Sequence, residues 1–502
     1  MKIFIFRRDF RLCDNSAFIK CLRDTLDKKT SDHRENILPI FIYNDDQIDD
    51  KKNAYFSNNA MQFLVESIQY LEQEIKQMGG KLYKLHVSKT ENETDLLVQI
   101  LSSYPNSSVY FNKDLTPFAR ERDNLLETNL RKKDINVYSL EDYTLFSIDE
   151  KKVKTTDNNA YKVFSPFYKK HKQLHSIVSE IASINDFVKT KDIPWFTNKN
   201  DFLDKMTSDM TKKEDSFYKK NDDISVNGGR KYALKILDII SKGDYKQYDK
   251  TRDQIYNEKG TTRLSAYLKF GCISIREFYW MVYKKYGISH ALIREIYFRE
   301  FYYHITWFYP HVLEGMKLKY KGKKEKNQNY LEIDIKWEKN KSALEKWKNG
   351  CTGTPLVDAA MRQLNQTGFM HNRGRMIVAM YLTKDLRINW REGEQYFASK
   401  LVDYDPSQNN AGWQWSASTG SDAQPYFRIM NPYTQQERFD KDSTYIKNWI
   451  PQLINVSSKE INKWEEINIR NKHKNICYPS PIVENHTKTA KETKKMFKSK
   501  KN

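Results

Sequence analysis

The stretch from Asn409 to Gly420, NNAGWQWSASTG, combines side chains that rarely occur together in an ordinary core. Trp413 and Trp415 are separated by one residue, two asparagines precede them, and small residues surround them. Indoles offer wide flat faces, amides both donate and accept hydrogen bonds, and small residues allow close approach to the backbone. The segment suits a flat aromatic ligand, although either tryptophan taken singly is more often a core residue.

Hydroxyl groups and a guanidinium are concentrated in residues 260–274, GTTRLSAYLKFGCIS. Thr261, Thr262 and Ser265 surround Arg263 there, at the expected start of a helix. Helix N-termini that carry hydroxyls and an arginine bind phosphate groups. On this segment alone, a capped helix start is the simpler explanation.

A helical pattern over residues 294–310 places charged groups among aromatic ones. Glu295 and Arg299 are four residues apart and so lie on one helix face, with Phe298 close to them. Such a pair is commonly a simple ion pair on a packed helix. The alternative is a carboxylate and an aromatic face that line a pocket.

Polar groups also gather between residues 368 and 405. The segment supplies hydrogen-bond donors, an adaptable thioether, an indole and two carboxylates, on His371, Asn372, Arg373, Arg375, Met376, Trp390, Asp403 and Asp405. Together with the hydroxyls and aromatic faces described above, these groups describe a ligand that is large, anionic at one end and flat at the other. A flavin dinucleotide meets that description.

Motifs for other chemistry are missing from the sequence. There is no G-x-G-x-x-G after the first apolar run and no G-x-x-x-x-G-K-[ST], so a standard dinucleotide or triphosphate site is unsupported. There is also no Ser/His/Asp nucleophile motif and no H-E-x-x-H metal motif, and we expect no metal.

The first 140 residues alternate between short apolar runs and amphipathic helices. Apolar residues recur at steps of three and four from Met61 to Met78, which predicts a helix that Gly79 and Gly80 end. TDLLVQIL and RERDNLLETNLRKK predict two more helices, and the strand candidates are IFIF, ILPIFIY, KLYKLHV, SVYF and INVYSL. Strands and helices in alternation predict a doubly wound parallel sheet of five strands, which binds ligands beyond the carboxyl ends of its strands.

We expect four parts along the chain. These are an α/β domain over residues 1–140, a polar linker over 141–228, an all-α domain over 229–475, and a basic tail over 476–502. The tail carries KTAKETKKMFKSKKN and little apolar matter, so we expect it to be disordered.

The charge balance favours an anionic partner. Lys and Arg outnumber Asp and Glu by 85 to 65, a net charge of +20, which favours nucleic acid first and an anionic membrane surface second. Nucleotide bias in the gene would also enrich lysine. Five scattered cysteines without a C-x-x-C pair argue against a disulfide framework, and no apolar run approaches the ~20 residues of a membrane helix. We expect a soluble, intracellular monomer that does not enter membranes.

The ordered set of motifs resembles the photolyase/cryptochrome family, most closely its class I cyclobutane pyrimidine dimer photolyases. The resemblance covers nearly the whole chain, in IFIFRRDFRLCDNSAF, GTTRLSAYLKFGCISIREFYW, FREFYYHITWFYP, GCTGTPLVDAAMRQLNQTGFMHNRGRM and INWREGEQYFASKLVDYDPSQNNAGWQWSASTGSDAQPYFRIMNPYTQ. It implies an α/β antenna domain followed by an all-α FAD-binding domain whose FAD is reduced in the active form.

The resemblance also implies roles for single residues. The family's cofactor-binding positions on the phosphate side correspond to Tyr248, Thr261, Thr262, Arg263, Leu264 and Ser265. Those on the flavin and ribityl side correspond to Arg299, Asn372, Arg375, Asp403, Asp405 and Asn409. Asn409 would face the flavin N5, and Arg375 with Asp403 would form an ion pair beside the ring. The electron-relay tryptophans, running from the flavin to the surface, correspond to Trp413, Trp390 and Trp337.

For the substrate, the family's dimer-contacting positions correspond to Glu295, Phe298, Asn372, Arg373, Met376 and Trp415. The implied activity is light-driven DNA repair, in which the damaged pair leaves the duplex and the excited flavin gives it an electron. The cyclobutane ring then splits and the electron returns to the flavin. Glu295, Asn409 and the relay tryptophans would be the catalytic residues.

Two other functions in the family stay open. One is a blue-light photoreceptor of the cryptochrome type that signals through protein partners. The other is a (6-4) photolyase, which typically has two adjacent histidines where this chain has His371 and Asn372, so dimer repair is favoured.

The chain departs from the family pattern in three places. Phe298 stands where class I enzymes usually have tryptophan, and the spacing from Tyr248 to Thr261 is one residue longer than usual. Folate-binding members carry Asn-Glu where this chain reads DLTPFARERD. A folate antenna, a deazaflavin antenna and no antenna therefore all stay open.

Overall fold

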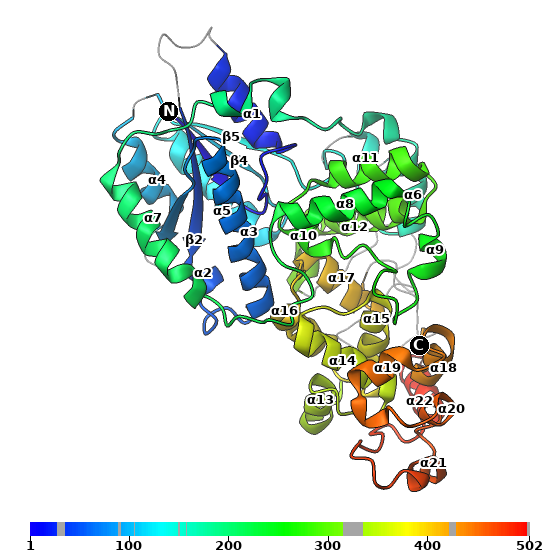
Figure 1. Ribbon diagram of the computed structural model, residues 1–502. Coiled ribbons are helices and arrows are strands. Elements are labelled where there is room, and N and C mark those ends of the chain that lie inside the picture. Colours follow the sequence, from blue (N-terminus) through cyan, green and yellow to red (C-terminus); the bar gives the residue numbers. More distant parts are fainter. Residues whose placement is uncertain are drawn as a thin grey trace.

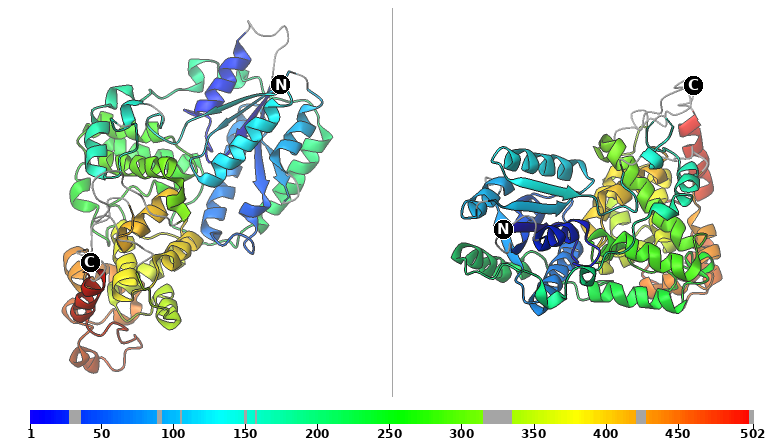
Figure 2. Two further views of the ribbon diagram at one scale, coloured as in Figure 1. Left: turned by 180° about the vertical axis from the view of Figure 1, so that it is seen from behind. Right: turned by 90° about the horizontal axis from the view of Figure 1, so that it is seen from above.

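The computed structural model describes residues 1–27, 36–88, 92–104, 106–148, 151–156, 158–314, 335–420 and 428–498. An α/β body and a helical body lie side by side, and the last helices extend from the far end of the helical body (Figures 1 and 2). Within the described ranges, no helix is long and apolar enough to cross a membrane.

The described part of the N-terminal domain contains one parallel sheet with the strand order β3-β2-β1-β4-β5. The chain leaves the central strand in one direction and later returns to its other side, so the predicted doubly wound sheet of five strands is confirmed. The strands are β1 (Lys2–Phe6), β2 (Ile37–Asn44), β3 (Tyr83–Val87), β4 (Ser108–Asn112) and β5 (Asn136–Leu140).

Alternate residues of β1 enter two different hydrophobic clusters. Phe4 and Phe6 pack on one face of the sheet, and Ile3 and Ile5 pack on the other. Because the side chains of a strand alternate in direction, helices must cover both faces of a fully buried sheet. The covering helices are α1 (Ser16–Leu26) and α3 (Asn58–Gln77) on the first face, and α4 (Glu93–Leu101) and α5 (Pro117–Arg131) on the second.

The second domain is helical. Gly368 ends one of its helices at a φ of 67°, a left-handed conformation that glycine adopts without strain, and the chain turns there into the helix that begins at Asn372. The helices are α8 (Arg230–Lys242), α9 (Tyr248–Thr251), α10 (Ser265–Lys269), α11 (Ile275–Tyr286), α12 (Ala291–Phe308), α13 (Lys341–Lys348), α14 (Pro355–Thr367), α15 (Asn372–Met380), α16 (Trp390–Lys400), α17 (Pro406–Ala417), α18 (Pro432–Phe439), α19 (Thr444–Trp449), α20 (Ser458–Ile461), α21 (Ile467–Lys472) and α22 (His486–Lys498).

The segment predicted as a linker packs against both domains. Its helix α6 (Phe164–Lys172) lies on α12, and its helix α7 (Asp201–Lys213) lies on β3. Trp195 is buried, and its backbone forms a parallel bridge with Ile37 of β2. The connection therefore adds to the cores that it joins.

Buried charges and one glycine fix the contact between the domains. Arg276 of α11 bonds Asp14 of the N-terminal domain at 2.9 Å and Asp142, just after β5, at 2.8 Å. At Gly271, with a φ of 61°, an added Cβ would lie 2.2 Å from the carbonyl oxygen of Arg8. Only glycine permits that approach, and the approach places Arg8 at the helical domain.

The C-terminal tail differs from its prediction. The sequence predicts disorder over residues 476–502, whereas the structure has helix α22 over His486–Lys498. His486 and Thr493 are buried, and they contact Asp385 and the backbone of Lys384. The prediction does not hold for this helix because composition counts apolar residues and does not register polar contacts to a distant segment. Residues 499–502 lie outside the described residues.

Candidate functional site

Helix α17, which carries the tryptophan-rich segment, is anchored at its N-terminus by Asp405. The Asp405 carboxylate caps the helix by accepting two backbone N–H groups, and it also accepts hydrogen bonds from Tyr303 at 2.7 Å and Arg8 at 3.1 Å. Burial alone would raise the pKa of this carboxyl group, but the cations of Arg8 and Lys269 outweigh burial and the pKa is lowered. Asp405 is therefore an anion that joins the first loop of the chain to the centre of the helical domain.

Asn409 lies one turn further along α17 and is oriented by Glu394 of α16. Its amide donates to the Glu394 carboxylate at 2.9 Å and to the Glu394 carbonyl at 3.1 Å. Burial raises the pKa of Glu394 to about 7. The sequence does not single out Glu394, because WREGEQYF resembles an ordinary amphipathic turn.

Glu394 predicts a pH dependence of stability. Its pKa is about 7 in the folded chain against an ordinary value of 4.5, so the folded state binds this proton more tightly. The resulting stabilisation is complete below about pH 4.5, decreases as the pH rises, and is lost above about pH 7, at about 1.4 kcal/mol per pKa unit. Glu394→Gln should flatten this part of a plot of Tm against pH. Glu392→Gln, at an exposed position of the same helix, should keep it, and an unchanged slope in Glu394→Gln would contradict the assignment.

On α15, Arg375 forms the ion pair that the resemblance implies. Its guanidinium contacts both carboxylate oxygens of Asp403, at 2.9 Å and 3.1 Å, and Nε donates to the carbonyl of Met370 at 2.8 Å. The pair is set against the ring of Phe369, 5.8 Å from the guanidinium carbon. These contacts hold a fixed charge pair at the base of α15.

The predicted substrate residues Glu295 and Arg373 bind two adjacent residues of one loop. Arg252 contacts Glu295 at 2.6 Å, and Asp253 contacts Arg373 at 2.7 Å. Burial raises the pKa of Glu295, and Arg252 opposes that effect. The sequence does not single out Arg252 and Asp253, because their partners are 43 and 120 residues away. The adjacent opposite charges in TRDQ are the only local signal.

The other predicted substrate residues differ in their exposure. Asn372 is exposed at the start of α15, and its amide lies 3.7 Å from the sulfur of Met376. Phe298 is covered on one face, because it stacks on Phe164 of α6 at 3.4 Å between ring centres and 8° between planes. Trp415 is half-buried, under the guanidinium of Arg428 at 4.0 Å. Residues 421–427 of this motif lie outside the described residues.

Among the predicted cofactor residues, Thr261 and Arg263 line a cavity of about 620 Å³ together with Phe369 and His371. The Nε of Arg263 is buried without a hydrogen-bond partner, and its guanidinium lies over the ring of Phe369 at 5.0 Å. The space where a Cβ on Gly412 would stand is open, with no neighbouring atom within 4 Å. The unpaired Nε of Arg263 beside the Thr261 hydroxyl fits a ligand with an anionic group.

The remaining cofactor predictions do not line that cavity. Arg299 is engaged by the protein, because it donates to the Tyr143 carbonyl at 2.6 Å and lies over the ring of Tyr303 at 4.5 Å. Ser265 is exposed and Thr262 half-buried, whereas Leu264 and Tyr248 are buried.

The three predicted relay tryptophans belong to one hydrophobic cluster. Trp413 and Trp390 are buried in it, and Trp337 packs on it while half-buried. Ring contacts join Trp413 to Phe397 at 5.0 Å and to Trp347 at 6.0 Å between ring centres. Trp347 has no distinguishing signal in the sequence, because a tryptophan at helical spacing looks like an ordinary core residue.

Gly393 sets how closely α16 approaches Trp413. A Cβ at this position would lie 2.1 Å from the indole of Trp413, so Gly393→Ala must displace the ring or the helix. We expect a loss of about 1–3 kcal/mol in unfolding free energy, measured by denaturant titration, and a blue or red shift in indole fluorescence. Glu392→Ala, the exposed neighbour, is the control and should stay within about 0.5 kcal/mol. Equal stability of the two variants would contradict the packing argument.

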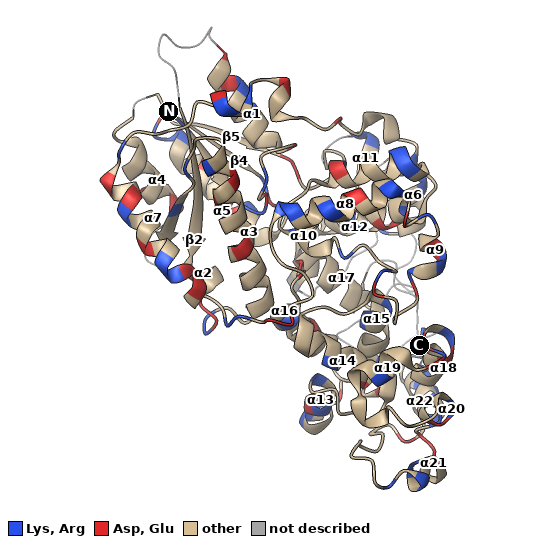
Figure 3. Cartoon of the chain, viewed as in Figure 1, with Lys and Arg blue, Asp and Glu red and all other residues tan. Residues whose placement is uncertain are grey.

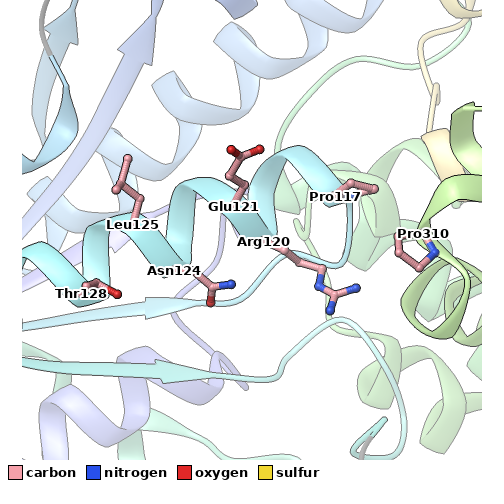
Figure 4. Close-up of a pocket in the computed structure, with 7 residues that line it drawn as sticks. All are labelled: Pro117, Arg120, Glu121, Asn124, Leu125, Thr128 and Pro310. Carbon is pink, nitrogen blue, oxygen red and sulfur yellow. The ribbon is translucent and has the colours of Figure 1, made fainter.

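A shallower hollow of about 530 Å³ lies along α5 at the end of α12 (Figure 4). Its lining residues are Pro117, Arg120, Glu121, Asn124, Leu125, Thr128 and Pro310. None of them is aromatic, so the hollow lacks the stacking surface on which flat chromophores bind.

Comparison with known proteins gives consistent matches. The model of the FAD binding domain of DNA photolyase matches residues 292–499, and the model of DNA photolyase matches residues 2–185. A deoxyribodipyrimidine photo-lyase of Alkalihalophilus pseudofirmus is 34% identical over 99% of this chain and 98% of its own. An archaeal photolyase structure from Sulfolobus tokodaii with two FAD molecules is 31% identical, with a TM-score of 0.79 over 99% of both chains. A bacterial class III photolyase structure from Agrobacterium tumefaciens is 28% identical, with a TM-score of 0.81 over 100% of this chain and 98% of its own.

Proposed function

Because the chain belongs to the photolyase/cryptochrome family, we propose that it is a light-driven DNA-repair enzyme that splits cyclobutane pyrimidine dimers. The observation that carries the proposal is the arrangement around α15. This helix presents Asn372, Arg373 and Met376 beside the Glu295–Arg252 pair, and it packs against α17, which carries Trp415. FAD, when bound and reduced, would supply the electron after it absorbs light.

For the cofactor, we propose that side chains already described hold its separate parts. Thr261 and Arg263 would bind the diphosphate, because their cavity has an unpaired guanidinium nitrogen. The Arg375–Asp403 pair would lie beside the ring system. Asn409 would donate or accept a hydrogen bond at the ring, in an orientation fixed by Glu394.

For the substrate, we propose that Glu295 accepts a hydrogen bond from a base of the extruded pair and that Trp415 stacks on it. Stacking on an aromatic side chain contributes about 1–3 kcal/mol per base. The guanidinium of Arg428 lies over the Trp415 ring at 4.0 Å, so the base would stack on the face opposite Arg428. One face of the Phe298 ring is covered by Phe164, so Phe298 can offer the extruded pair its ring edge and one face at most. His371 is buried as the N-cap of α15 and Asn372 follows it, so a pair of histidines for (6-4) chemistry is missing.

The binding of DNA is expected to depend steeply on salt. Lys and Arg are frequent on α6 and α8 and occur near α9 and α15 (Figure 3), and phosphate contacts release bound counterions. Affinity for an irradiated oligonucleotide should fall about 100-fold or more between about 50 and 200 mM salt. An undamaged oligonucleotide should show the same slope at lower affinity, because phosphate contacts carry no sequence information. A flat response would count against direct DNA binding.

One experiment tests the proposal as a whole. The purified protein is examined for a flavin spectrum and then illuminated under reducing conditions with an oligonucleotide that contains a thymine dimer. Bound flavin with light-dependent loss of dimers supports repair. Bound flavin without repair favours the photoreceptor function, and a colourless protein that FAD cannot reconstitute contradicts both.

A further inference from the structure

The turn that follows α15 is a π-helix, η9 (Tyr381–Asp385), and all five of its residues are buried. A π turn inserts an extra residue and so re-aims the side chains after it; such turns are frequent at functional sites. Here it directs Lys384 away from solvent and toward the C-terminal end of α17. None of the roles derived above uses this lysine.

The Lys384 ammonium binds the last turn of α17. It donates to the carbonyl of Ala417 at 2.9 Å and to the hydroxyl of Ser418 at 3.0 Å. Ser418 ends the helix in a left-handed conformation, with a φ of 64°. The last carbonyls of a helix have no partner within the helix, and a cation there also complements the helix dipole. Burial lowers the pKa of Lys384 to about 7, so this contact is made at a substantial cost in desolvation.

Helix α22 also contacts η9. Thr493 donates its hydroxyl to the carbonyl of Lys384 at 2.6 Å, and His486 lies 2.8 Å from the carboxylate of Asp385. The last helix of the chain, the π turn and the end of α17 therefore form one continuous line of contacts. Trp415 lies within the last turn of α17, at the end of that line.

We propose that Lys384 is a positioning residue that fixes the last turn of α17 and, through it, the indole of Trp415 on which the extruded dimer stacks. The inference rests on the proposed function. Asp405 anchors the first turn of the same helix, so α17 is fixed at both ends. The C-terminal end, which Lys384 fixes, is the end that carries Trp415 and therefore the end that affects dimer binding.

Lys384→Met tests the role, because methionine fills the buried space without a donor. In the flavin-loaded variant, hydrogen exchange of the amides in residues 413–420 should accelerate. The dissociation constant for a thymine-dimer oligonucleotide should rise about fivefold or more, as expected for partial loss of stacking on one base. The repair yield per photon at saturating oligonucleotide should stay within about twofold, because the change affects binding.

Lys84→Met is the matched control. Lys84 of β3 is also fully buried, where it pairs with Glu72 at 2.9 Å and Glu214 at 3.0 Å, far from α17 in the chain. The Lys84→Met variant should have a lower Tm but the same dissociation constant for the thymine-dimer oligonucleotide as the wild type. A rise of the same size in both variants would mean that lost stability, and not positioning, weakens binding, and would overturn the inference.

Thr493→Val provides a second, milder variant in case Lys384→Met does not fold. Thr493→Val should also accelerate hydrogen exchange of the amides in residues 413–420. Thr207→Val is its control and should not, because the buried Thr207 hydroxyl that it removes accepts from the backbone N–H of Lys84 at 3.2 Å. Unchanged exchange and dimer affinity in Thr493→Val would overturn the inference. If the wild type itself shows no preference for dimer-containing DNA, the proposed function fails, and the exchange data still decide whether Lys384 fixes α17.

Discussion

Light-driven reduction of oxidised flavin in the Trp413→Phe variant is expected to be about 100-fold slower than in the wild type, a barrier about 2.7 kcal/mol higher. A phenyl ring is much harder to oxidise than an indole, so the first donor of the proposed relay is lost. The ring still fills the space against Phe397 and Trp347, which lie 5.0 Å and 6.0 Å away. Repair by enzyme that is chemically reduced beforehand should be retained, because the relay is needed only to reduce the flavin.

The measurement is the rate of bleaching of flavin absorbance under blue light with an external reductant. Trp464→Phe is the matched control, because Trp464 is equally buried but packs against His473 and Tyr478 near α20 and α21. It should lose stability and keep normal photoreduction. Unchanged photoreduction in Trp413→Phe would refute the relay, and a loss in Trp464→Phe of the same size would assign the effect to stability.

Glu295→Gln is expected to lower dimer repair about 10-fold to 100-fold while flavin content stays unchanged. A hydrogen bond to a charged group contributes about 1.5–3 kcal/mol, and glutamine keeps the shape of glutamate without its charge. The carboxylate contacts only Arg252 among its described hydrogen-bond partners, at 2.6 Å, so it keeps acceptor capacity for a base. Repair is measured as the loss of dimers per absorbed photon and as a function of oligonucleotide concentration.

Arg252→Gln and the double variant complete a cycle that separates the ion pair from the base contact. If Glu295 acts only through Arg252, the double variant should repair as well as either single variant. Glu345→Ala on α13 is the control, because that carboxylate forms an exposed pair with Lys348 and should have no effect on repair. Equal loss of repair and of flavin in Glu295→Gln would mean that this residue supports the fold and not the substrate.

The strands and the long helices could be predicted from sequence because their signals are local. Strand and helix patterns alternate in the first 140 residues because helices cover both faces of the buried sheet. The apolar residues from Met61 to Met78 recur about once per helical turn. Helix α22 was not predicted, because its signal is not local. Its burial depends on His486 and Thr493 meeting η9, about 100 residues earlier in the chain, and local composition does not record that meeting.

The candidate site residues also fall into two groups, those with a local sequence signal and those without one. Candidate residues such as Arg263, Glu295 and Asn409 could be proposed from types and spacing together with the family resemblance. Their partners could not be named: Glu394 looks like a surface residue of an amphipathic helix, and Arg252 like a loop cation. The covering of Phe298 by Phe164 was equally hidden, because the two rings come from the linker and the helical domain.

The sequence by itself determined the sheet, most of the helices and the excess of positive charge, and it supplied the candidate residues for a flat, anionic ligand. Only the tertiary structure decided which charges meet: Arg8 reaches Asp405 across 397 residues, and Lys384 reaches the end of α17. The physical reason is that periodicity and turn chemistry act over a few residues, whereas ion pairs, buried donors and pKa values depend on neighbours that only folding brings together.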